Sequence, residues 1–96
     1  MKKQQALHLL TISKPLLKEK YGVTKIALFG STARDTANPN SDIDILIDFD
    51  SPATSKRYFG VLFYLEDLLQ HPIDLITENA LRPELRPYIE KETIYV

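Results

Sequence analysis

The segment from Asp42 to Phe49 reads D-I-D-I-L-I-D-F, and its alternation of acidic and apolar residues is typical of a strand. Successive side chains on a strand point to opposite faces, so the carboxylates of Asp42 and Asp44 are expected to share one face. Two carboxylates this close repel each other unless a cation lies between them or one is protonated. Mg²⁺, which takes oxygen ligands and substrate phosphates, suits such a pair. A solvated strand face is the alternative for an isolated pair, and it is the reading adopted for Asp48 and Asp50.

A third aspartate, Asp74, lies inside the otherwise apolar segment from Pro72 to Ile76. A carboxylate buried in a strand is costly unless it is paired or binds a metal, whereas one on the exposed face of an edge strand is not. If this strand lies beside that of Asp42 and Asp44, three carboxylates converge. Such a triad could hold two Mg²⁺ ions about 4 Å apart, an arrangement that promotes in-line phosphoryl transfer.

A possible phosphate site lies upstream, where Gly30 ends the apolar segment 25–29 and Ser31 follows it. Free N–H groups at a helix start bind phosphate, and glycine lets a phosphate approach the backbone. Arg34 could reach a phosphate or could pair with Asp35 on the surface. A Gly-Ser pair alone usually marks a turn, so this signal depends on the carboxylates downstream.

The elements that must position these residues are indicated by hydrophobic periodicity and by turn formers. Together they predict a small α/β (α+β) domain, a mixed sheet flanked by helices, spanning residues 1–96. The first expected helix is 3–10. The second is capped by Ser13, has Pro15 in its first turn and Leu16 and Leu17 on its apolar side, and ends at Gly22. The others run from Ser51-Pro52 to Leu69 and over 79–91, with Pro87 bending or restarting the last one. The expected strands are 25–29, 42–49, 73–77 and a short one at 94–96.

The helix ending at Leu69 carries more apolar surface than one core face needs. Six residues follow helical spacing and should face the sheet: Tyr58, Val61, Leu62, Leu65, Leu68 and Leu69. Phe59 and Phe63 lie partly off this stripe. We expect them to pack under the first helices; the alternative is a docking face for a partner or a second copy.

Composition narrows the function classes. With 12 basic and 13 acidic residues the net charge is −1, which argues against a free-standing nucleic-acid binder, so no direct DNA binding is expected. No cysteine is present, so thiolate metal sites and disulfides are excluded. The N-terminal segment has too short an apolar stretch for a secretory signal or a spanning helix, and a cytoplasmic protein is expected.

Other ligand-binding motifs are missing. Three glycines, Gly22, Gly30 and Gly60, cannot form a dinucleotide-binding fingerprint, and no Gly-Lys-Ser/Thr is present. Two histidines far apart in sequence, His8 and His71, make a zinc hydrolase a poor fit.

Two segments together, L28-F-G-S-T-A-R34 and S41-D-I-D-I-L-I-D48, resemble the DNA polymerase β-type nucleotidyltransferase superfamily. Its motif is a Gly-Gly or Gly-Ser turn followed by D-x-D, and here ten residues separate Ser31 from Asp42. The whole chain is similar to the minimal (MNT) nucleotidyltransferases, through I73-D-L-I76 to the ending L81-R-P-E-L-R-P-Y-I-E90. One departure is Asp35, where relatives often have glycine.

The resemblance implies a polymerase β-like fold and a role for each candidate residue. Gly30 and Ser31 would bind phosphate, Asp42 and Asp44 would bind Mg²⁺, and Asp74 would assist deprotonation of the acceptor. It also implies an antitoxin that transfers AMP from ATP to a tyrosine hydroxyl of a HEPN ribonuclease toxin, in a homo- or hetero-oligomer. The rival hypotheses are a non-catalytic antitoxin that acts by binding alone, and nucleotidyl transfer to an RNA end or a small molecule.

Overall fold

The computed structural model describes residues 1–96 and contains a four-stranded sheet with the strand order β3-β2-β1-β4. Strand β1 pairs antiparallel with β2 and β4, whereas β2 pairs parallel with β3, so the predicted mixed α+β sheet is confirmed. The elements in chain order are α1 (Lys3–Tyr21), β1 (Val23–Phe29), α2 (Gly30–Ala33), β2 (Ile43–Phe49), α3 (Ser55–Leu69), β3 (Ile73–Thr77), the 3₁₀ turn η1 (Glu78–Ala80), α4 (Arg86–Glu92) and β4 (Ile94–Tyr95).

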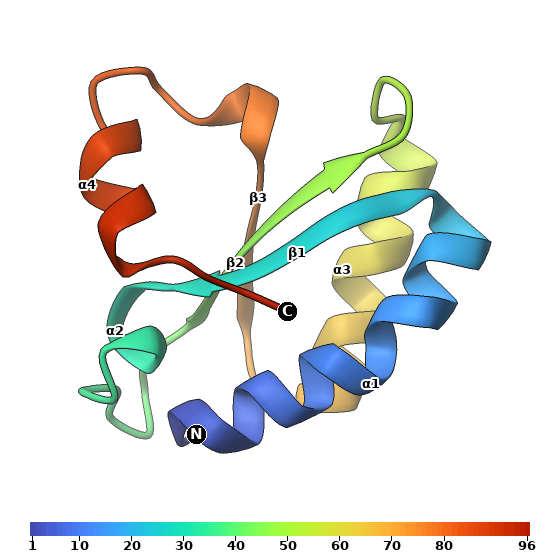
Figure 1. The fold of residues 1–96 in the computed structure, drawn as a ribbon. Coiled ribbons are helices and arrows are strands. Elements are labelled where there is room, and N and C mark those ends of the chain that lie inside the picture. Colours follow the sequence, from blue (N-terminus) through green and yellow to red (C-terminus); the bar gives the residue numbers. More distant parts are fainter.

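The main core lies between the sheet and two helices. Figure 1 shows α1 and α3 side by side on one side of the sheet, with α4 on the other. Ile43, Ile45 and Ile47 are almost completely buried in this core, as the strand alternation predicts. Along α3, Val61, Leu65 and Leu69 are buried in it, and Tyr58, Leu62 and Leu68 pack against it. The predicted core stripe of α3 is therefore confirmed.

The opposite face of the sheet carries a smaller apolar cluster. Ala27, Phe29 and Leu46 are buried there, with Ile76 of β3 and Ile89 of α4 packed against them. Because side chains alternate along β2, Asp44 lies on the same thinly covered face as Leu46. The candidate carboxylates therefore project from the side of the sheet that the two long helices leave open.

One continuous helix, α1, replaces the two short helices that the sequence predicts. Ser13 does not cap a second helix: it is buried, and its hydroxyl donates to the Leu10 carbonyl at 2.8 Å. Pro15 lies inside the helix without an N–H to donate. Burial of Ala6, Leu10 and Leu17 offsets that loss, and the helix continues to Gly22, whose φ of 74° ends it as predicted.

Helix α3 begins three residues later than predicted, at Ser55 rather than at Pro52. Thr54 is the N-cap, and its hydroxyl accepts a hydrogen bond from the Arg57 N–H at 3.2 Å. Ser51 instead donates to the Asp50 carboxylate, which also pairs with Arg57 at 3.0 Å. The turn from β2 is thus held by polar contacts, and the helix starts only where a cap is available.

Replacing Thr54 with alanine is expected to destabilise the fold by about 1 kcal/mol, because the Arg57 N–H loses its capping partner. Chemical denaturation of the purified protein measures this change. Ser55→Ala is the matched control, since Ser55 is the exposed first residue of the helix and its hydroxyl caps nothing. An equal loss in both variants would mean that Thr54 does not act as a cap.

The C-terminal third differs most from expectation. The predicted helix over 79–91 is instead the 3₁₀ turn η1, a short irregular segment and α4, which starts at Arg86 with Pro87 in its first turn. Pro87 thus restarts the helix rather than bending it, because proline lacks the N–H that a helix interior requires. The short final strand is confirmed: Ile94 and Tyr95 of β4 pair with β1.

Two predictions about apolar packing are wrong. Phe59 and Phe63 do not pack under α1: they are 47% and 62% exposed and stack on each other with ring centroids 5.9 Å apart. Leu16, expected on the apolar side of its helix, is also exposed, whereas Leu17 is fully buried. Both errors arise because the sheet is narrow and covers only one stripe of each helix. None of the helices is both long and apolar enough to cross a bilayer.

Candidate active site

The strand order brings two of the three candidate carboxylates together. Strand β3 lies beside β2, and Asp44 and Asp74 are direct partners in the parallel register. Partners in neighbouring strands point to the same face, so both side chains project from the open side of the sheet. The carboxylates converge only if these two strands are adjacent, and the structure shows that they are.

Asp74 itself is not buried. Its side chain is exposed on β3, which is the edge strand of the sheet. Of the two alternatives for Asp74, the exposed face of an edge strand is therefore the one found, and the expectation that burial would force a partner on this carboxylate is wrong. What links Asp74 to the site is its register with Asp44, a partly buried residue of the neighbouring strand.

Asp44 has an unusual electrostatic environment. Its pKa is raised from 3.8 to about 6, first because burial disfavours the charged form, and next because the Asp74 carboxylate acts on it through charge and hydrogen bonding. The charges of Asp42 and Glu92 raise the pKa further. The folded structure thus disfavours the ionised form of the Asp44 carboxyl, as expected for a group that a bound cation would stabilise.

The third carboxylate, Asp42, is exposed and lies just before β2 begins. In the structure, no three acidic or histidine side chains lie close enough together to hold a metal ion. The chemistry of the carboxylates nevertheless fits Mg²⁺: the site offers carboxylate oxygens and no nitrogen or sulfur donor, and a divalent ion would relieve the repulsion that raises the Asp44 pKa.

Gly30 lies against the Asp44 side chain. Its φ is 72°, a left-handed conformation that favours glycine. A Cβ atom at this position would lie 2.0 Å from Oδ2 of Asp44. The turn after β1 and the carboxylate on β2 are therefore in direct contact, and only a residue without a side chain permits it. Any ligand held by this turn would lie beside Asp44.

The short helix α2 begins at Gly30 and carries Ser31, which is half-buried. Arg34 follows, and its partner is Glu92 rather than Asp35. Its Nη1 atom lies 2.5 Å from Oε2 of Glu92, and Oε1 of Glu92 accepts a hydrogen bond from the Gly30 N–H at 3.2 Å. Sequence reasoning missed Glu92, because its partners are about sixty residues away in the chain and no local pattern marks it.

Asp35, the position where relatives often have glycine, adopts φ = 60°. Aspartate tolerates this left-handed conformation better than most side chains, so the turn keeps its shape without glycine. Its Oδ1 atom accepts a hydrogen bond from the Lys3 N–H at 3.2 Å, which ties the loop to the start of α1.

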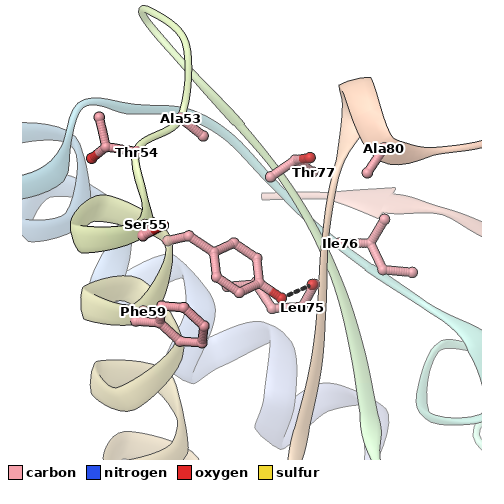
Figure 2. Close-up of a pocket in the computed structure, with 9 residues that line it drawn as sticks. Ala53, Thr54, Ser55, Phe59, Leu75, Ile76, Thr77 and Ala80 are labelled. Carbon is pink, nitrogen blue, oxygen red and sulfur yellow. Dashed lines mark hydrogen bonds between the residues drawn. The ribbon is translucent and has the colours of Figure 1, made fainter.

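A hollow of about 530 Å³ runs along the edge of β3, between that strand and the start of α3. Figure 2 shows its lining, with a hydrogen bond at the centre: the Tyr58 hydroxyl donates to the Leu75 carbonyl at 2.5 Å. Phe59 closes the α3 side, and Ile76 and Ala80 line the opposite wall. Burial and the negative charge of Asp74 raise the Tyr58 pKa. The hollow therefore lies next to the carboxylate site.

Comparison with known proteins gives consistent matches. Residues 11–96 match the nucleotidyltransferase domain family. The protein adenylyltransferase MntA of Thermococcus cleftensis is 35% identical over 88 residues, covering 92% of this chain and 89% of the relative. A Methanocaldococcus jannaschii protein, provisionally named a protein adenylyltransferase, is 45% identical over 84 residues, or 86% of each chain.

Solved structures agree with this fold. One, provisionally described as a minimal nucleotidyltransferase, superposes with a TM-score of 0.77 at 28% identity, covering 98% of this chain and 95% of the other. A chain from the complex of a tri-AMPylated Shewanella oneidensis HEPN toxin with its MNT antitoxin gives a TM-score of 0.66 at 19% identity, covering 97% of this chain and 70% of the other. At that identity the second match supports the fold alone.

Proposed function

This chain belongs to the nucleotidyltransferase domain family, and we propose that it is an antitoxin that transfers AMP from ATP to a tyrosine hydroxyl of a HEPN toxin. The observation that carries the proposal is the contact between the two parts of the site, the Gly30 turn and the carboxylates. The Gly30 turn lies against Asp44, and Asp44 is in register with Asp74. A phosphate-binding turn and a pair of carboxylates in contact form the site that nucleotidyl transfer requires.

We assign the roles as follows. Gly30, Ser31 and Arg34 bind the triphosphate, and Asp42, Asp44 and Asp74 hold Mg²⁺, two ions being the number that three carboxylates suit. When bound, Mg²⁺ neutralises charge that develops on the transferred phosphoryl group and the leaving group. The tyrosine oxygen bonds to the α-phosphorus, the bond to the β-phosphate oxygen breaks, and pyrophosphate leaves. Asp74, exposed on the edge strand, accepts the hydroxyl proton.

The order of the strands suggests where the acceptor approaches. In-line transfer requires the attacking oxygen and the leaving group to lie on opposite sides of the phosphorus. The Gly30 turn follows β1, on one side of Asp44, whereas Asp74 lies on β3, on the other side. The acceptor tyrosine therefore enters from the β3 edge, beside the hollow lined by Tyr58 and Ile76. We further propose that the protein works in the cytoplasm, does not bind DNA or membranes, and acts in a homo- or hetero-oligomer with its toxin.

Intact-mass spectrometry tests the proposal. The purified chain, incubated with ATP, Mg²⁺ and the HEPN protein encoded beside it, is expected to add one or more AMP masses to that protein. The analogue α,β-methylene-ATP is the control, because its methylene bridge prevents release of the leaving group. Absence of any mass shift with ATP would contradict the proposed transfer.

The same pair of proteins separates catalysis from simple binding. An Asp42→Ala/Asp44→Ala double variant should still fold and should fail to protect cells from the toxin. If it protects as well as the parent chain does, neutralisation occurs by binding alone. The exposed Phe59 and Phe63 pair would then be the first surface to test for that binding.

A further inference from the structure

The carboxylate of Glu92 lies where two proposed phosphate-binding groups converge. Oε1 accepts a hydrogen bond from the Gly30 N–H, and Oε2 forms an ion pair with the Arg34 guanidinium at 2.5 Å. Arg34 has no other ion-pair partner in the structure. A backbone N–H and a guanidinium directed at one anion are the contacts that a phosphate group would make in the same place.

We propose that Glu92 is an internal substitute for the phosphate of the nucleotide, holding the site ready while it is empty and competing with ATP for it. The inference rests on the proposed function, since it takes Gly30 and Arg34 as nucleotide-binding residues. Phosphate and carboxylate compete here: the Gly30 N–H has one hydrogen to donate, and two anions held side by side on the Arg34 guanidinium would repel each other. ATP binding therefore displaces the Glu92 carboxylate.

The backbone around Glu92 is arranged so that only the side chain needs to move. Glu92 is the last residue of α4, and after Thr93 the chain continues into Ile94 and Tyr95, which pair with β1. Val96 adds a backbone hydrogen bond to Ile26 at 3.0 Å, and its carbonyl accepts from Lys14 at 2.7 Å. The chain is thus anchored on the C-terminal side, while the Glu92 side chain is partly exposed and has room to rotate.

Displacing the Glu92 carboxylate from Arg34 and Gly30 costs free energy, which lowers the measured affinity for ATP. An ion pair with side chains this exposed contributes little, so its competition with ATP is modest but not negligible. Glu92→Gln keeps the shape of the side chain and removes its charge. The variant side chain therefore binds Arg34 more weakly and no longer repels the triphosphate of ATP. The variant is expected to bind ATP about fivefold more tightly than the parent chain.

Isothermal titration calorimetry, with ATP added to the full chain in the presence of Mg²⁺ and without the toxin, measures this change in ATP affinity. Glu90→Gln is the matched control: it lies on the same helix, and its carboxylate contacts Arg86 at 3.6 Å rather than Arg34. The control should leave the affinity unchanged. In an Arg34→Ala background, Glu92→Gln should have a smaller effect, because one of the two shared donors is gone and only the Gly30 N–H remains.

A second measurement uses the unaltered protein, so it does not depend on the folding of a variant. The ¹³C chemical shift of the Glu92 carboxyl should move when ATP saturates the site, because the carboxylate loses both donors. An unchanged shift, or an unchanged or weaker affinity in Glu92→Gln, would overturn the inference. A loss of transfer and of Mg²⁺ affinity in that variant would also overturn it, by making Glu92 a metal ligand.

These outcomes are separable from those of the proposed function. A parent chain that binds no ATP overturns both proposals together. A parent chain that binds ATP and transfers AMP, with Glu92→Gln unchanged in affinity, overturns only the role of Glu92. If the Glu92→Gln variant binds ATP more tightly but the parent chain modifies no toxin, the role of Glu92 is supported and the proposed acceptor is contradicted.

Discussion

Replacing Asp44 with asparagine is expected to reduce AMP transfer about a thousandfold and, in the absence of divalent ions at pH 7, to stabilise the fold by about 1 kcal/mol. Under the proposed mechanism, transfer falls because a neutral amide does not replace the carboxylate charge that would hold Mg²⁺ and offset developing charge. Stability rises because the variant removes a carboxylate that burial and Asp74 make unfavourable. An active-site residue that weakens the fold is expected where function opposes stability.

The stability effect should depend on pH in a defined direction. The pKa of Asp44 in the folded state, about 6, lies above the ordinary value of 3.8, so folding disfavours its charged form. Below pH 3.8 the carboxyl is protonated in both states and costs nothing. Between pH 3.8 and about 6 the unfolded chain gives up this proton and the folded chain retains it, so the parent chain loses stability relative to the variant, and the loss is complete above pH 6. The full shift would correspond to about 3 kcal/mol, and partial exposure reduces the expected value to about 1 kcal/mol.

Urea denaturation of both proteins in EDTA, from pH 4 to pH 7, measures this difference. Asp48→Asn is the matched control: Asp48 lies on the same strand, and its Oδ1 accepts a hydrogen bond from the Phe49 N–H. It should show neither the gain in stability nor the loss of transfer. If Asp44→Asn is less stable than the parent chain at pH 7, or equally active, the electrostatic account of the site is wrong.

The sequence allowed much of this site to be predicted, because its parts lie on local patterns. The alternation in β2 placed Asp44 on one face and Ile45 on the other, and both placements agree with the structure. Strand order is a different matter. Nothing near Asp74 in the sequence states which strand it pairs with, since pairing is decided by how α3 crosses over the sheet.

The features that could not be predicted depend on distant contacts. Glu92 reaches Gly30 and Arg34 only because β4 folds back onto β1, which places the end of α4 over the turn. Pro15 predicts a helix start, since local rules penalise proline inside a helix and do not include the core burial that offsets the penalty. In both places tertiary packing outweighed the local signal.

Replacing Gly30 with alanine is expected to destabilise the fold by about 3 kcal/mol and to abolish AMP transfer. Two effects add. An alanine at φ = 72° is strained, and its Cβ would lie 2.0 Å from Oδ2 of Asp44, so either the turn or the carboxylate must move. Each movement separates the proposed phosphate site from the carboxylates. Thermal and chemical unfolding measure the first effect, and the AMP mass shift on the toxin measures the second.

Gly22→Ala separates backbone strain from the contact. Gly22 has nearly the same φ, 74°, but its Cβ would meet the Asp50 carboxylate at 2.7 Å, and that side chain is exposed and can rotate away. This variant should lose only about 1 kcal/mol and should keep full transfer activity. Equal losses of stability in the two variants would mean that backbone conformation alone explains the requirement for glycine at position 30.

A double-variant cycle isolates the contact with Asp44. If the collision is responsible for most of the loss, Gly30→Ala should cost much less in an Asp44→Ala background, where the carboxylate is absent, and should approach the cost of Gly22→Ala. If the cost is the same in both backgrounds, the turn and the carboxylate are independent, and the contact that joins the two halves of the proposed site does not constrain the sequence. A reduced cost would show that Gly30 is required because Asp44 occupies the space that a side chain would need.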